Sequence, residues 1–165
     1  MKAPVANRPY MPGYGVQGPD EGTGLLPWSW AEKRLAASHD FWLATVRPDG
    51  RPHLMPVWAV WHRSSVWFSC SGRSRKTANL SANARCSIST DNPIEPVVIE
   101  GVAELISNVD TLRVILDIEN RKYSTNYTMD LFDPVVNACF RIEPVWTFRI
   151  AESDFTGLPT RWTFE

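Results

Sequence analysis

Short apolar segments separated by turn-forming residues dominate the chain between residues 41 and 150, a pattern typical of antiparallel strands. Phe41–Arg47 is rich in aromatic and β-branched residues, and the Asp49-Gly50 pair that follows is typical of a tight hairpin turn. The return strand is predicted from His53 to His62, where Pro56 indicates a sheet edge, a bulge or an opening of the ladder. Further strands are predicted at residues 66–69, 85–90 and 97–106, and as a closing pair at 138–142 and 145–150 that Pro144 interrupts.

Three other segments carry helical signals. The first helix is expected to begin near Pro27, where Ser29 followed three residues later by Glu32 predicts a capping box, and to end by His39. The other two helices are predicted at residues 75–82 and 110–121, and residues 122–134 are predicted as a polar, aromatic loop.

About six strands joined by hairpins, with a few inserted helices, indicate a mainly β (α+β) fold, an antiparallel barrel with peripheral helices. Gly101, in the middle of one long strand, predicts a β-bulge. Residues 1–24 are rich in Pro and Gly and are expected to form an extended N-terminal arm. Residues 25–165 are expected to form a single domain, with residues 156–165 as a tail.

Composition excludes several functional classes. The formal net charge is −1 and no basic face is apparent, which argues against a nucleic-acid partner. The three cysteines form no CxxC pair, so neither a disulfide framework nor a structural zinc site is expected. The sequence shows neither a signal-peptide pattern nor an apolar run long enough for a membrane span, so a cytoplasmic protein without a membrane partner is expected.

The segment from Ser69 to Leu80 carries the clearest chemical signal, because a strand ends, a polar loop follows and a helix begins. The first N–H groups of a helix have no internal acceptor, and the helix dipole favours an anion there. Gly72 allows close approach of a ligand to the backbone. The segment supplies three hydroxyl groups and three cations, namely Ser69, Ser71, Ser74, Arg73, Arg75 and Lys76. These residues predict a phosphate site, and a solvated basic turn is the competing interpretation.

The strand-turn-strand at residues 43–58, the strand at 66–69 and the Lys76-x-x-Asn79-Leu80 helix resemble the pyridoxamine 5'-phosphate oxidase-like split β-barrel superfamily. The resemblance is greatest to its actinobacterial branch that uses the deazaflavin coenzyme F420. It implies a six-stranded split β-barrel and a homodimer with two cofactor grooves at the subunit interface. It also implies that residues 69–79, with Lys76 and Asn79 at the motif positions, hold the phosphate. The tricyclic ring is then expected against one strand, at Met55, Pro56, Val57 and Trp58.

The resemblance implies a reductase that transfers a hydride from reduced coenzyme F420 to a conjugated small-molecule acceptor. An FMN-dependent oxidoreductase and a non-catalytic carrier of a cofactor or tetrapyrrole are the alternatives. Vitamin B6 oxidation is disfavoured, because the C-terminal Arg and His substrate motifs are not found. The sequence identifies no catalytic residue and no metal ligands, which fits an enzyme whose chemistry resides in its cofactor.

Several other side chains have two interpretations. Trp58 and Trp61 are expected on opposite sides of their strand, with Trp58 at the ring site and Trp61 in the core. His53 is interpreted as a surface or capping residue. Cys70 is interpreted as a packing residue. One group is interpreted either as the border of the neighbouring subunit's substrate pocket or as a plain surface loop, namely Lys122, Tyr123, Asn126 and Tyr127. The tail pair Arg161-Trp162 is suggested to cover the same groove.

Overall fold

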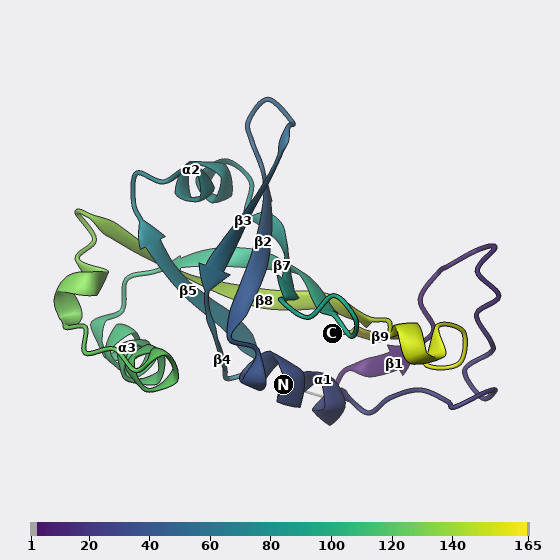
Figure 1. Ribbon diagram of the computed structural model, residues 1–165. Helices are drawn as coiled ribbons and strands as arrows, with labels where there is room; N and C mark the ends of the chain where they lie inside the picture. Colours follow the sequence, from purple (N-terminus) through teal and green to yellow (C-terminus); the bar gives the residue numbers. More distant parts are fainter. Residues whose placement is uncertain (1–2, 165) are drawn as a thin grey trace.

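The predicted hairpin is the most prominent feature of the computed structural model, which describes residues 3–164. It is formed by β2 (Asp40–Val46) and β3 (Pro52–Trp58), and its tip extends beyond the rest of the sheet (Figure 1). Gly50 adopts a φ of 84°, the left-handed conformation for which the Asp-Gly pair was expected. The turn is closed because the Arg47 N–H donates to the carbonyl of Arg51 at 2.9 Å.

The strands of the described sheet pair antiparallel throughout. This confirms the predicted mainly β fold of the split-barrel type, although the sheet does not close into a complete barrel. The main path runs β1-β9-β8-β7-β6-β2-β3, and β5 joins it through β8 while β4 pairs with β5. The remaining strands are β1 (Val5–Asn7), β4 (Val60–His62), β5 (Ser65–Ser71), β6 (Arg85–Thr90), β7 (Val97–Ile106), β8 (Asn137–Arg149) and β9 (Thr160–Thr163).

The long β8 strand corrects one expectation and confirms another. Residues 137–149 form one continuous strand, so Pro144 does not divide it as predicted. The register against β7 shifts between Glu100 and Gly101, which leaves Val145 as an extra residue beside Pro144. The proline, which has no N–H to donate, therefore stands where the ladder is already irregular, and the bulge predicted at Gly101 is confirmed.

A side chain at position 101 is expected to destabilise the protein. A methyl group on Gly101 would overlap the carbonyl oxygen of Glu143 and lie 2.8 Å from Cγ2 of Ile142. Because β7 and β8 would have to separate, we expect Gly101→Ala to lower the free energy of unfolding by about 1–3 kcal/mol. Equilibrium unfolding in urea measures this change, and an unaltered midpoint would show that the two strands have room to adjust.

Within the described residues, three α-helices cover the ends of the sheet: α1 (Trp28–Ala37), α2 (Arg75–Ala82) and α3 (Val109–Tyr123). The same part of the chain also forms two short 3-10 helices, η1 (Met129–Phe132) and η2 (Glu152–Asp154). The predicted capping box is wrong, because α1 is capped by Pro27 without a side-chain bond and Ser29 already lies in the first turn. Lys122 and Tyr123, predicted in a loop, instead form the last turn of α3.

The two ends of the described chain meet in the sheet. β1 pairs with β9, with Ala6 opposite Trp162, and β9 pairs in turn with β8. Trp162 is completely buried, and its indole packs edge-on against Trp28 at 5.6 Å between ring centroids. The suggestion that this tryptophan covers a ligand groove is therefore wrong, because it belongs to the core. Among residues 3–164, none of the helices combines the length and apolar character needed to cross a bilayer.

Candidate cofactor-binding site

The junction between β5 and α2 is a rigid polar turn. Ser74 caps α2, because its hydroxyl oxygen accepts a hydrogen bond from the Thr77 N–H at 3.3 Å. The Gly72 N–H donates to the carbonyl of Val136 at 2.8 Å, and the Thr77 hydroxyl donates to the carbonyl of Ser71 at 2.9 Å. The N–H groups of the first turn of α2 that follow the cap have no acceptor within the helix. The turn therefore leaves those N–H groups for an acceptor outside the helix.

The cations of the junction are available to a ligand. Arg73 and Arg75 are exposed and Lys76 is half-buried, so the junction is not sealed inside the core. None of the three forms an ion pair with a carboxylate within residues 3–164. An unpaired cluster of positive charge beside a helix N-terminus is suited to a phosphate or carboxylate group.

The β2–β3 hairpin lies directly beside this junction. Asn79 of α2 is buried and donates from its side-chain amide to the Thr45 hydroxyl of β2 at 2.9 Å. The same hydroxyl lies 3.4 Å from Nδ1 of His53, which is opposite Thr45 in β3. The Asn79 side chain therefore fixes α2 to the hairpin, and it places His53 at the edge of the cationic turn.

Two further basic residues reach the junction from the hairpin, and the sequence interpretation did not include them. Burial, and then the positive charges of Arg47, Arg75 and Lys76, lower the pKa of His53. The Nε atom of Arg47 is buried and has no hydrogen-bond partner within residues 3–164. Strand alternation could have indicated His53, because it precedes Met55 by two positions and so shares its face.

The predicted ring-binding residues lie on two faces of β3. Met55 and Val57 are opposite Leu43 and Phe41, on the face that carries Thr45 and α2. Val57 is buried, whereas Met55 is 42% exposed. By alternation, Pro56 and Trp58 point to the other face. The structure therefore brings Met55 together with the cationic junction and places Trp58 on the opposite side.

Trp58 closes a second cluster at the end of β3. Its ring is 47% exposed and stacks on Tyr123 of α3, with centroids 4.3 Å apart and planes within 4°. Trp61, by contrast, packs against the core beside Trp28, as predicted, whereas Trp58 lies away from the cationic junction beside which it was expected.

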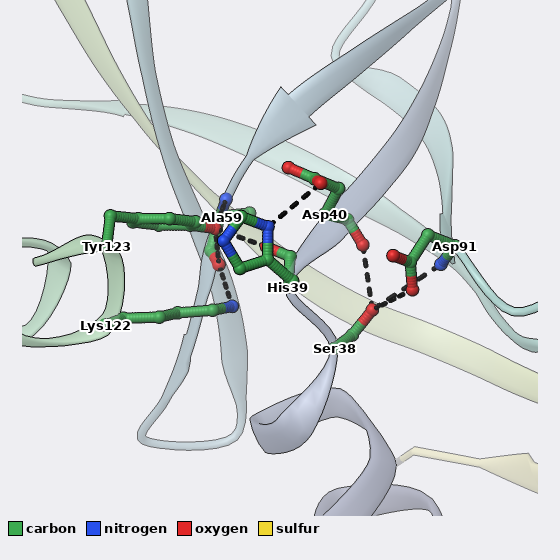
Figure 2. A network of polar contacts seen from close by, with 7 residues as sticks. All are labelled: Ser38, His39, Asp40, Ala59, Asp91, Lys122 and Tyr123. Carbon is green, nitrogen blue, oxygen red and sulfur yellow. Dashed lines mark hydrogen bonds and ion pairs between the residues drawn. The ribbon is translucent and has the colours of Figure 1, made fainter.

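Lys122 and Tyr123 hold the backbone at Ala59, and this explains why the predicted strand 53–62 divides there (Figure 2). The Ala59 N–H donates to the Tyr123 hydroxyl at 2.8 Å, and the Lys122 ammonium donates to the Ala59 carbonyl at 2.5 Å. Both Ala59 main-chain groups are thus bonded to side chains of α3. Burial lowers the pKa of Lys122 to about 8 and raises that of Tyr123 to about 12.

Two hollows flank the junction. One, of about 450 Å³, lies behind Gly72 and Thr77 and is lined mainly by apolar side chains of β7, α3 and η1. The other, of about 620 Å³, lies across β2, β6, β7 and β8. Met55 and Lys76 line neither of these two hollows. No three His, Cys, Asp or Glu side chains in residues 3–164 are arranged to hold a metal ion.

Comparison with known proteins agrees with this geometry. The family model described as pyridoxamine 5'-phosphate oxidase matches residues 31–147, which include the hairpin, the cationic junction and most of β8. The chain belongs to the pyridoxamine 5'-phosphate oxidase family. The match confirms the superfamily that the hairpin and the Lys-x-x-Asn-Leu helix indicated. A search of curated protein sequences gave no match.

Solved structures of the pyridoxamine 5'-phosphate oxidase fold include diverse relatives. An F420 reductase is 27% identical, with a TM-score of 0.58 over 70% of this chain and 94% of that one. The conserved hypothetical protein Rv2991 from Mycobacterium tuberculosis is 24% identical, with a TM-score of 0.65 over 74% and 82%. The haem storage protein HutZ from Vibrio cholerae is 16% identical, with a TM-score of 0.59 over 70% and 88%. The last two similarities show the fold alone.

Proposed function

We propose that this protein is a reductase that uses reduced coenzyme F420 and transfers a hydride to a conjugated small-molecule acceptor. The observation that carries the proposal is the unpaired cationic cluster at the start of α2, beside the exposed Met55 on the adjacent strand. A cofactor with an anionic tail and a planar ring needs these two surfaces side by side. The 27% identical F420 reductase favours this cofactor over the others.

Each residue would have a defined task. Arg73, Arg75 and Lys76 neutralise the anionic group, and the first N–H groups of α2 orient it. Asn79 does not need to contact the ligand directly, because its bond to Thr45 holds α2 at the correct distance from the hairpin. Met55 supplies apolar contact to one face of the ring, while the buried Val57 supports it from the core. The bound deazaflavin supplies the hydride, while the protein positions it and limits the access of water.

A homodimer would complete the site. Met55 is exposed and lines neither hollow, whereas a drug-sized ligand usually has most of its surface covered. The outer faces of the sheet carry exposed apolar side chains, among them Trp42, Leu54 and Val102. Exposed apolar area of this kind is suited to burial against a second copy of the chain. We therefore place the second wall of the groove on a partner subunit.

The test is a cofactor-binding titration with Lys76→Ala. Loss of a charge-assisted hydrogen bond is expected to weaken the binding of coenzyme F420 by about 1.5–3 kcal/mol, a change of about 10- to 150-fold in Kd. Quenching of cofactor fluorescence measures the affinity. Lys33→Ala is the matched control, because Lys33 is exposed on α1, which lies at the other end of the sheet (Figure 1).

The same titration with FMN and haem distinguishes the alternatives. Much tighter binding of FMN would replace the proposal by an FMN-dependent oxidoreductase. Tight binding of haem or of F420 without turnover of any acceptor would indicate a carrier. An unchanged Kd for F420 in Lys76→Ala would move the phosphate site away from α2.

A further inference from the structure

His53 stands where three cations from two elements converge. Arg47 approaches from the hairpin, and Arg75 and Lys76 approach from α2. These are the charged groups that act on the imidazole, and Asp49 at the hairpin turn acts on Arg47. The imidazole is half-buried, and its Nδ1 lies 3.4 Å from the hydroxyl of Thr45. Its position is therefore fixed at the border between β3 and the cationic junction.

An imidazole differs from its neighbours because it can lose its charge. A fourth permanent cation beside Arg47, Arg75 and Lys76 would be repelled in the absence of a ligand. Burial and these three charges lower the pKa of His53, so they favour the neutral ring in the free protein. An anion bound among the cations would reverse this balance, because a nearby negative charge favours the protonated imidazole.

We propose that His53 is a fourth ligand of the cofactor's anionic group and takes up a proton when that group binds. The inference deepens the proposed function and rests on it, since it requires the anion to bind beside α2. A neutral imidazole can donate from only one nitrogen, whereas the protonated ring adds a positive charge that attracts the anion, so binding and protonation would be linked. Arg47, whose buried Nε has no partner within residues 3–164, would bind the same group from the hairpin side.

Linkage fixes the direction of the pH effect. Because the complex binds more protons than the free components, the affinity of the wild type should rise as the pH falls. As the pH is lowered from 8 to 6, we expect Kd to decrease by at most about tenfold for each pH unit. Titration calorimetry at pH 7 in buffers of different ionisation enthalpy should show net uptake of up to about one proton.

Two substitutions isolate the imidazole from any titration of the cofactor itself. His53→Gln keeps a polar side chain and should lose both the proton uptake and the part of the pH dependence that belongs to the protein. His53→Arg carries a permanent charge, and at pH 8 it should bind about as tightly as the wild type does at pH 6. A merely structural role of His53 would not predict improved binding in His53→Arg.

Lys76→Ala separates this inference from the proposed function. It should weaken binding at every pH while proton uptake persists. Coenzyme F420 and FMN are used in parallel as probes. If neither binds the wild type, the proposed function fails and the role of His53 fails with it. If either binds but His53→Gln takes up the same number of protons as the wild type, the role of His53 alone is overturned.

Discussion

Trp162→Ala is expected to lower the free energy of unfolding by about 3–5 kcal/mol, the range for removal of a buried tryptophan side chain. The side chain is completely buried, packs against Trp28 and donates from Nε1 to the carbonyl of Leu26 at 3.2 Å. Alanine would leave a cavity and an unpaired carbonyl at the point where β9 joins β1 to β8. β1 and β9, the strands near the two ends of the described chain, would both lose the core contact that holds them against β8.

Equilibrium denaturation followed by circular dichroism measures this loss. Tyr10→Ala serves as the control, because Tyr10 is 87% exposed and its removal should change stability by no more than about 0.5 kcal/mol. Trp162→Phe should lower the free energy of unfolding by less than Trp162→Ala does and by more than Tyr10→Ala does. Phenylalanine retains most of the apolar volume but loses the indole donor. A loss below about 1 kcal/mol in Trp162→Ala would show that β9 is separate from the cooperative core.

Glu119→Gln is expected to stabilise the protein at neutral pH by up to about 3 kcal/mol. Glu119 of α3 is 5% exposed, and one of its carboxyl oxygens has no partner within residues 3–164. Burial raises its pKa to about 7, and the charge of Lys122 only partly offsets this. The folded state therefore holds a proton on Glu119 between about pH 4.5 and 7 that the unfolded chain releases, so stability falls as the pH rises through this window.

The stabilisation should therefore depend on pH in a defined way. Near pH 4.5 and below, the carboxyl is neutral in the folded state and at most about half ionised in the unfolded chain, so the amide gives little advantage. At pH 7.5 the wild type carries a buried carboxylate, and the difference should be greatest. Urea midpoints between pH 4.5 and 7.5 measure this, with Asp117→Asn as the control because Asp117 is exposed on the same helix. A gain that is equal at both ends of the range would contradict the buried charge.

Local signals in the sequence predicted most of the elements that carry the site. Asp49-Gly50 predicted the hairpin, and the helical signal at residues 75–82 predicted α2. Interactions between distant residues could not be predicted in this way. Ala6 pairs with Trp162 only because the folded sheet brings them together, and the strand break at Ala59 depends on Lys122 and Tyr123 of α3. Ser29 and Glu32 satisfied the capping pattern, yet Pro27 already caps α1.

The candidate site shows the same division. Arg73, Arg75 and Lys76 lie within four residues of sequence, so the sequence alone identifies them as a cluster. Arg47 and His53 join them only because the side-chain bond between Asn79 and Thr45 fixes α2 to the hairpin. That contact spans 34 residues, and no local pattern predicts it. The hydrogen bond that fixes α2 to the hairpin therefore determines which charged side chains lie in the same site.

The proline positions of β3 have a consequence for how this molecule meets other chains. β3 is the last strand on the main path of the sheet, and Pro52 and Pro56 have no amide hydrogen to offer along it. An incoming strand would find gaps in the row of donors, so the ladder resists extension by a foreign polypeptide. Association through this region is left to side-chain surfaces, where shape and chemistry discriminate between partners better than main-chain pairing does.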